Sequence, residues 1–225
     1  FIDGDGIGPE VVTEVRRVLD AVAPAAGFDC EAHVHPWGCD YYLEHGRMMP
    51  PDAIEMLGQH DAIFLGAAGD PCRVPEEVAV RETVLAIRFG FELYANIRPV
   101  RPLPGAPYPL ERPSADEIDF TVVREATEGL YVGLGGRFPP DAPEVEQIAS
   151  TRHVFDRSSE IALQTGVFSE AGCRRVIERA FRLAEQRDGK RLVTSATKAN
   201  AMRHGMVLWN EIFEDVANEH PDVES

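Results

Sequence analysis

The stretch FIDGDGIGPEVVTEVRRVLDAV, residues 1–22, decides the fold predicted for the start of the chain. Phe1, Ile2 and Asp3 indicate the end of a buried strand, and the closely spaced glycines after them predict a tight turn. Pro9 suits the first position of a helix, and apolar residues then recur at helical spacing up to Val22. A phosphate-binding turn is the less favoured interpretation, because the spacing is not G-x-G-x-x-G.

Strand-like and helix-like segments continue to alternate along the 225 residues. This order predicts an α/β protein with an open, largely parallel sheet and helices on both faces. The remaining strands are expected at 30–37, 61–65, 94–100, 118–124 and 192–195. The remaining helices are expected at 51–59, at 76–88, from the N-cap Ser169 to Gly189, and from Lys198 through Val216.

A proline-rich segment at 102–109 stiffens the chain and predicts the crossing between two domains. The first domain is expected to span 1–100, and a second α/β domain is expected to span 101–225. Residues 133–168 are rich in glycine, proline and β-forming residues without a helical period, which predicts an extended β-arm. A surface loop is an equally weighted alternative for this segment.

The composition is that of a globular protein, with 44% hydrophobic and 27% charged residues. The formal net charge of −16 argues against a nucleic-acid partner, since phosphate binding needs a positive surface. No apolar run is long enough to span a membrane, so no membrane partner is expected. The thiols lack CxxC and metal-ligand spacing, which is typical of a reducing cytosol and predicts a cytoplasmic protein. They are Cys30, Cys39, Cys72 and Cys173.

Arginines carry the clearest chemical signal. Arg88 and Arg98 lie in IRFGFELYANIRPVRP (87–102), Arg124 and Tyr131 lie in VVREATEGLYVG (122–133), and Lys198 lies in TSATKAN (194–200). Arginine grips carboxylates through two parallel charge-assisted hydrogen bonds, each contributing roughly 1.5–3 kcal/mol. Together with a tyrosine and a lysine, these arginines indicate a site for a small acid that undergoes proton transfer. Surface ion pairs, a packed tyrosine and a solvated lysine are the alternative interpretation.

These segments, in this order, resemble the metal-dependent β-decarboxylating dehydrogenases, a family that includes isopropylmalate, isocitrate, homoisocitrate, tartrate and D-malate dehydrogenases. The resemblance rests on GDGIGPEV, IRFGFELYANIRPVR, VVREATEGLYVGLGG and ATKAN. The tartrate/D-malate branch is favoured by WGCDYYLEHGRMMP (37–50), GDPCRVPEEV (69–78) and LGGRF (134–138). Arg81 stands where that branch usually has tryptophan.

The resemblance implies a role for each substrate-site residue. Arg88, Arg98 and Arg124 would hold the carboxylates of a small dicarboxylic 2-hydroxy acid. Tyr131 would protonate the enolate after carbon dioxide departs, and Lys198 would take the proton from the C2 hydroxyl. Two further residues, Val84 and Leu85, would contact the substituent on C3.

The resemblance also implies cofactors. NAD would accept the hydride, with Ile7, Glu82 and Asn200 near it, and residues 1–100 would form the first part of the NAD-binding domain. Mg²⁺ or Mn²⁺ would assist, with K⁺ as an optional further ion. The metal ligands and the adenosine-binding loop are expected beyond Ser225, because the sequence is expected to be cut at both ends. A homodimer with shared active sites is expected, with 101–225 as the substrate and dimerisation domain.

The expected activity is NAD-dependent oxidation and decarboxylation of tartrate or D-malate. One alternative is 3-isopropylmalate dehydrogenase, because Val84 and Leu85 are close to the paired leucines of that enzyme. Isocitrate is disfavoured, since its third carboxylate would meet Glu82 and an apolar wall. An alternative of another class is a catalytically silent, regulatory or truncated subunit.

Overall fold

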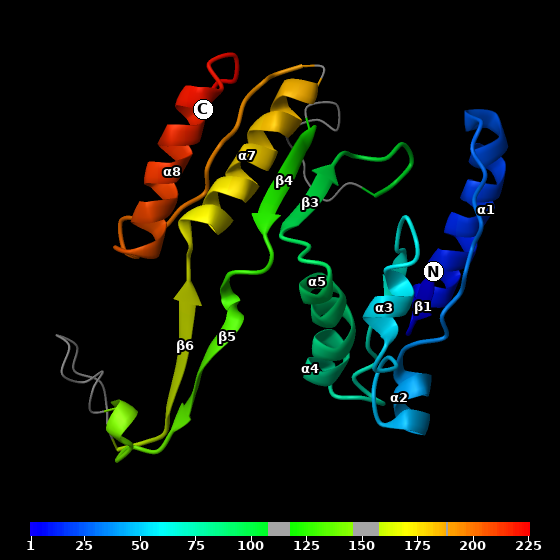
Figure 1. Ribbon diagram of the computed structural model, residues 1–225, viewed down its shortest axis with the longest axis horizontal. Helices are drawn as coiled ribbons and strands as arrows, with labels where there is room; N and C mark the ends of the chain where they lie inside the picture. The colour runs from blue at the N-terminus through cyan, green and yellow to red at the C-terminus, as the bar shows by residue number, and fades with distance from the viewer. Residues whose placement is uncertain (108–117, 146–157, 188) are drawn as a thin grey trace. The chain divides into compact units, whose positions relative to one another are not determined.

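A computed structural model describes residues 1–107, 118–145, 158–187 and 189–225 (Figure 1). These residues form two compact units, Phe1–Leu93 and Tyr94–Ser225. The units meet in sequence at Leu93 and Tyr94, whereas the sequence placed its boundary after Val100. The assignment of a cofactor domain and a substrate domain stays a prediction, and each unit is described by itself.

The first unit begins with the predicted strand, turn and helix. Its strand β1 (Ile2–Gly4) pairs in parallel with β2 (Leu65–Ala67), and α1 (Gly8–Ala26) starts four residues after the strand with Pro9 in its first turn. Gly4 has a φ of 70°, and a Cβ atom there would overlap the carbonyl oxygen of Ala67. Glycine is therefore required at the end of β1, because only it combines this conformation with so close an approach of β2.

The helices of the first unit follow in chain order. They are α2 (Cys39–His45), α3 (Ala53–Leu57), α4 (Glu76–Ala79), the π-helical η1 (Val80–Leu85) and α5 (Ala86–Gly90). The last three form one continuous helical stretch where a helix at 76–88 was expected. One buried cluster contains Ile2, Trp37 and Ile87, and a second contains Cys39, Met48 and Val74. The first cluster joins the parallel strand pair to α3 and α5, and the second joins α2 to α4.

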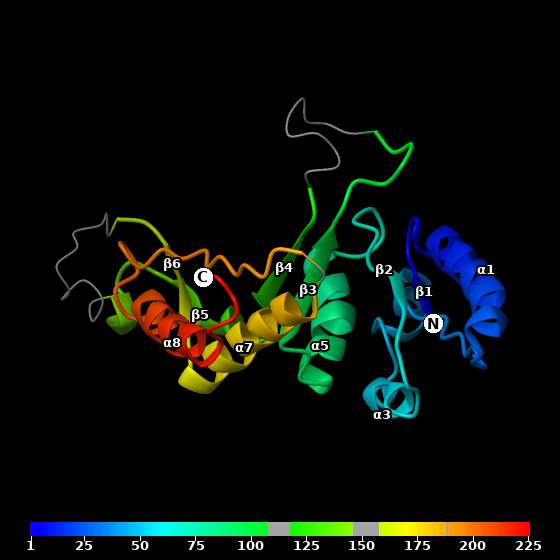
Figure 2. The same cartoon turned by 90° about the horizontal axis from the view of Figure 1, so that it is seen from above.

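The second unit combines antiparallel strand pairs with two long helices. Strand β3 (Ala95–Val100) pairs with β4 (Phe120–Glu125), and β5 (Gly129–Phe138) pairs with β6 (Ile161–Val167). Strand β6 runs almost directly into α7 (Glu170–Gln186), and α8 (Gly205–Glu219) lies beside α7 in both views (Figures 1 and 2). Phe181, Val176 and Val216 are fully buried between these helices, and Val123 of β4 packs against the same cluster.

The α/β character is confirmed, but the largely parallel sheet is wrong for the described residues. Their strands form one parallel and two antiparallel pairs. Two segments predicted as strands each make a single bridge, Ile2 with His35 and Leu192 with Glu224. These two segments lack a run of ladder hydrogen bonds and therefore stay irregular. Strand β4 pairs antiparallel with β3, so the connection between them is not the crossover that a parallel pair requires.

The described part of the predicted arm is the β5–β6 ribbon, and residues 146–157 of the arm lie outside the described residues. Leu130 and Leu134 on β5 are exposed, and a role for this ribbon in contacting a second subunit stays a prediction. Among the helices that the structure describes, none combines the length and apolar character that crossing a bilayer requires.

Candidate active site

Two predicted substrate arginines lie on one face of the β3–β4 ladder. Asn96 of β3 is opposite Arg124 of β4, and Arg98 is opposite Val122. Side chains alternate between the faces of a strand, so Arg98 and Arg124 are diagonal neighbours on the same face. Such neighbours lie about 7–8 Å apart, within reach of one small dicarboxylate for side chains as long as arginine.

The opposite face of this ladder is the one that packs into the unit. Val123 contacts the core cluster of α7 and α8, and the Glu125 side chain is only 14% exposed. Arg98 and Arg124 are both exposed. The Arg98 Nε–H donates to Asn96 Oδ1 at 2.7 Å, which holds the guanidinium close to the residue opposite Arg124. The ladder thus presents two positive charges outward on one support.

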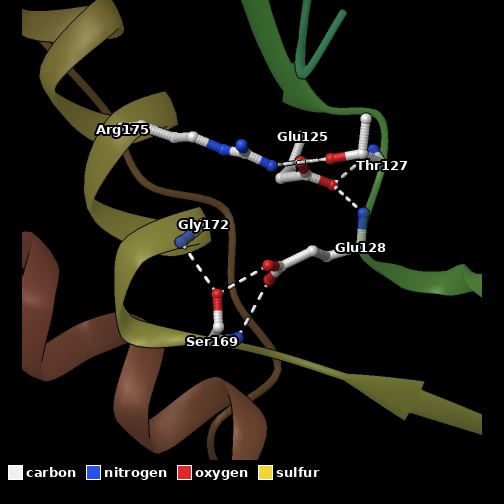
Figure 3. A network of polar contacts seen from close by, with 6 residues as sticks. All are labelled: Glu125, Thr127, Glu128, Ser169, Gly172 and Arg175. Carbon is white, nitrogen blue, oxygen red and sulfur yellow. Dashed lines mark hydrogen bonds and ion pairs between the residues drawn. The ribbon is translucent and has the colours of Figure 1, made fainter. Parts of the chain in front are cut away.

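A short loop joins Arg124 to Tyr131 and is fixed by its own acids (Figure 3). The Glu125 carboxylate accepts hydrogen bonds from Thr127 N at 2.7 Å, Thr127 Oγ1 at 2.6 Å and Glu128 N at 2.5 Å. The Tyr131 N–H donates to the Glu128 carbonyl at 3.3 Å, and the Tyr131 side chain is 39% exposed. The loop therefore begins at one predicted site residue and ends at another.

Helix α7 holds this loop at two places. Ser169, the N-cap residue, donates through N and Oγ to the Glu128 carboxylate at 2.9 and 2.5 Å, and its Oγ accepts from Gly172 N at 2.9 Å. Arg175 donates to Thr127 Oγ1 at 2.8 Å and reaches Glu125 Oε1 at 3.4 Å. The cap at Ser169 was predicted from the sequence and is confirmed.

Cys173 lies beside these acids on α7 and is 2% exposed. Burial, with the nearby charges of Glu128 and Glu125, raises the pKa of the Cys173 thiol. The thiol is therefore held in its protonated form, which is a poor nucleophile. This cysteine belongs to the core and not to the reacting groups.

Lys198 and Asn200 lie on the segment that precedes α8. The sequence placed Lys198 at the start of a helix, and this is wrong, because α8 begins at Gly205 and the Lys198 carbonyl instead closes a turn to Ala201 and Met202. Both Lys198 and Asn200 are exposed. The segment is tied to α8 by Trp209, whose Nε1–H donates to Ser195 Oγ at 2.9 Å. Met202, which the sequence placed within this helix, precedes it and is 46% exposed.

The remaining predicted site residues belong to the first unit. Val84, Leu85 and Glu82 lie in the π-helical η1, and Arg88 follows in α5. Val84, Leu85 and Arg88 are all half-buried. A π-helical turn is rare and frequently occurs at functional sites, because it shifts side chains out of the ordinary helical spacing. Here it falls on the residues that the sequence assigned to the substrate and cofactor.

Glu82 has a contact that the sequence did not predict. Its Oε2 accepts from the Met48 N–H at 2.9 Å, so the carboxylate also fixes the loop after α2. A pocket of about 520 Å³ opens beside it. Its charged lining residues are Arg47, Arg81 and Glu82, and its apolar ones include Met49 and Ile54.

Asp5 is the structural residue that sequence reasoning missed. It is 6% exposed, and its carboxylate accepts from Cys39 N at 2.6 Å and from Gly69 N at 2.8 Å. It thereby ties the turn after β1 to the start of α2 and to the turn after β2. Ile7, predicted to lie near NAD, is two residues further on and is 65% exposed. The sequence feature that could have identified Asp5 is an acidic residue between two glycines at the end of a buried strand.

The residues that the structure describes contain no group of three or more His, Cys, Asp or Glu side chains that could hold a metal ion. NAD is different, because Ile7 is exposed at the carboxyl end of the parallel pair β1–β2. Ligands of open α/β sheets bind at that edge. A place for NAD at this edge stays a prediction, and the described residues offer no donor group for a metal ion.

The profile of the isocitrate/isopropylmalate dehydrogenase family matches residues 1–225. The chain belongs to this family. It is 41% identical over 223 residues to a probable tartrate dehydrogenase/decarboxylase of Agrobacterium vitis, covering 99% of this chain and 58% of that protein. It is 42% identical over 223 residues to the decarboxylating D-malate dehydrogenase of Escherichia coli K12, covering 99% and 57%. The resemblance inferred from the sequence is confirmed.

A solved structure agrees with the family assignment. The crystal structure of isocitrate dehydrogenase from Methylococcus capsulatus matches with a TM-score of 0.75 at 26% identity, covering 99% of this chain and 57% of that one. The chain therefore spans 57–58% of the length of the curated relatives described above.

Proposed function

We propose that this chain forms the substrate-gripping part of an NAD- and divalent-metal-dependent enzyme that oxidises and decarboxylates tartrate or D-malate. The observation that carries the proposal is the pair Arg98 and Arg124, exposed as diagonal neighbours on the face of β3–β4 that points away from α7. The family membership and the names of relatives at 41–42% identity support this substrate class.

The arginines suit a malate-type acid because such an acid carries two carboxylates. Each guanidinium can bind one carboxylate through two parallel hydrogen bonds. Two cations on one rigid ladder would hold the acid in a fixed orientation before any bond breaks, which is a large part of what an enzyme supplies. Arg88 is proposed as a third substrate-binding arginine.

Lys198 and Tyr131 are proposed to move protons. The Lys198 amine would accept the proton of the C2 hydroxyl as the C2–O bond becomes a carbonyl. NAD, when bound, would supply the acceptor for the hydride that leaves C2. The bond from C3 to its carboxylate would then break, carbon dioxide would leave, and the electron pair of that bond would pass into the enolate. Tyr131 would donate its phenolic proton to C3, and the product would be a 2-oxo acid.

The other proposed contacts concern specificity and cofactors. Val84 and Leu85 would face the substituent on C3, where an apolar wall discriminates by only about 1–3 kcal/mol per methylene. Ile7, Glu82 and Asn200 would lie near NAD. The metal, Mg²⁺ or Mn²⁺, is proposed to draw its ligands from outside the described residues. A homodimer with shared active sites in the cytoplasm completes the proposal.

The test is NADH formation by the native protein with Mn²⁺ and K⁺, with D-malate, tartrate and 3-isopropylmalate compared side by side. Turnover favouring D-malate or tartrate is expected. A preference for 3-isopropylmalate would assign the protein to that activity instead. Absence of turnover with all three acids would contradict the enzymatic proposal and favour a regulatory or truncated subunit.

Lys198 offers a matched variant pair, because the chain has two lysines, Lys190 and Lys198. Lys198→Met is expected to abolish turnover while acid binding, measured by calorimetry, stays within about threefold. Lys190→Met removes the same charge eight residues earlier and is expected to keep full turnover. Wild-type activity in Lys198→Met would show that its assigned role is wrong.

A further inference from the structure

The loop between Arg124 and Tyr131 contains two acidic residues, Glu125 and Glu128, whose carboxylates accept hydrogen bonds from the protein itself. Glu125 accepts three hydrogen bonds from the loop itself, from Thr127 N, Thr127 Oγ1 and Glu128 N. Glu128 accepts two hydrogen bonds from Ser169 across 41 residues of sequence. Neither carboxylate is therefore directed to the substrate face, and both act on the conformation of the loop.

Helix α7 provides the partners at its first turn and at its second. The Glu128 carboxylate lies at the N-terminus of this 17-residue helix, where the helix dipole favours negative charge. Arg175 reaches the loop from one turn further along and also stacks over the Tyr94 ring, with its central carbon 4.8 Å from the ring centroid. One helix and its N-cap residue thus hold the loop at Glu125, Thr127 and Glu128 (Figure 3).

The backbone of the loop is also fixed from β3. The Ala126 N–H donates to the Tyr94 carbonyl at 2.8 Å, and Ala126 is 1% exposed. Since α7 packs on the core against α8 through Phe181 and Val176, the helix itself is rigidly placed. A loop with anchors on α7 and β3 has little freedom to move the residues at its ends.

We propose that Glu128 and Arg175 are positioning residues, which fix Tyr131 and Arg124 respectively. This inference rests on the proposed function, in which Arg124 binds a carboxylate and Tyr131 donates a proton. Glu128 controls Tyr131 because its backbone carbonyl accepts the N–H of Tyr131, three residues later in the chain. The side chain of the same Glu128 is held by Ser169. Arg175 controls Arg124 because it contacts Glu125, the next residue in β4.

The two positioning residues predict different kinetic effects. Glu128→Gln keeps the shape of the side chain but replaces one of its two acceptor oxygens and removes the charge at the N-terminus of α7. The contact with Ser169 is weakened, so the Tyr131 end of the loop loosens. We expect kcat to fall about 10- to 100-fold with KM little changed, since displacement by about 1 Å costs this much. Arg175→Gln loosens the Arg124 end, and we expect KM for the acid to rise about tenfold with a smaller effect on kcat.

Arg174→Gln is the matched control on the same helix. Arg174 pairs with Glu219 of α8 at 2.9 Å, so its loss removes an ion pair of the helix without touching the loop. Both kinetic constants are expected to stay within about twofold of the wild type. If Arg174→Gln lowers kcat or raises KM as much as the other two variants, a general loss of stability explains the results and the inference is overturned.

Gly172→Ala is a second variant that separates positioning from stability. A Cβ atom on Gly172 would overlap the Glu128 carboxylate, whereas alanine is the better residue for a helix. The variant should therefore displace Glu128 while favouring the helix, and we expect the same fall in kcat as in Glu128→Gln. An unchanged kcat would count against the role of Glu128.

Hydrogen exchange of the loop amides, measured on the native protein, does not depend on turnover. The amides of Thr127, Glu128 and Tyr131 are expected to exchange at least tenfold faster in Glu128→Gln and Arg175→Gln, but not in Arg174→Gln. Equal exchange in all three would overturn the inference even in an active enzyme. If these two variants exchange faster but the wild type turns over no acid, the proposed function is contradicted while the contacts that hold the loop are established.

Discussion

Asp5 permits a quantitative test, because one buried carboxylate bridges two turns of the first unit. It accepts Cys39 N at 2.6 Å and Gly69 N at 2.8 Å, and the residue is 6% exposed. Asp5→Asn keeps the size of the side chain but can accept only through one atom. The other backbone N–H then faces an NH₂ group and stays unsatisfied in a buried place.

The expected loss follows from the two hydrogen bonds. Each bond from an N–H to a charged acceptor contributes about 1.5–3 kcal/mol, and a neutral bond contributes about 1 kcal/mol. Retaining one neutral bond and losing the other entirely predicts a destabilisation of about 2–5 kcal/mol. Asp5→Ala removes both acceptors and is expected to cost more than Asp5→Asn.

The assay is urea unfolding followed by the emission of Trp37, which is 4% exposed and packs in the same cluster as Ile2. Trp209 is replaced by Phe in every sample, so that the emission reports the first unit. Asp20→Asn, on the exposed side of α1, removes the same charge and is expected to cost less than about 0.5 kcal/mol. A cost below about 0.5 kcal/mol for Asp5→Asn would refute the assigned bridging role.

Three further results are expected. Phe181→Ala should destabilise the second unit by about 3–5 kcal/mol in thermal unfolding, because Phe181 is 0% exposed between α7 and α8. Arg98→Lys should raise KM for the acid about tenfold in steady-state assays, since lysine keeps the charge but loses the planar fork. Burial, with His60 and His33 adding to it, lowers the pKa of His35 below 6.5. Stability should therefore be full above pH 6.5 and decline as the pH falls through the lowered value, and unfolding at pH 7.5 and 5.5 in wild type and His35→Gln measures this.

Local signals in the sequence predicted several elements well. The glycine-rich turn followed by Pro9 gave the strand, turn and helix at the N-terminus, and Ser169 gave the start of α7. These elements depend on capping and on backbone conformation within a few residues. By contrast, Val18 of α1 is 59% exposed although it follows the predicted apolar pattern. Periodicity predicts a helix face but not whether another element covers that face.

Long-range contacts explain what could not be predicted. The π-helical turn at 80–85 depends on packing around Thr83, which is 1% exposed and donates to the Ala79 carbonyl. The position of Arg98 and Arg124 as diagonal neighbours depends on strand register, which the order of the motifs does not determine. The bridge made by Asp5 joins positions 34 and 64 residues away. Each of these features depends on where a distant segment of the chain lies. The motifs therefore identify the residues, but only the fold determines which of them are neighbours.

The strong negative charge of the chain is compatible with binding a dicarboxylate because the acids nearest the arginines are already paired. Glu125 and Glu128, beside Arg124, accept hydrogen bonds from the loop and from Ser169. Asp119 precedes β4, and hydrogen bonds from Arg187 and then Arg101 hold the pKa of its carboxyl below the usual range. Carboxylates that face their own donors contribute little field toward the outward face of the ladder. The net charge of −16 therefore describes the chain as a whole, while the outward face of β3–β4 presents the two exposed guanidinium groups of Arg98 and Arg124.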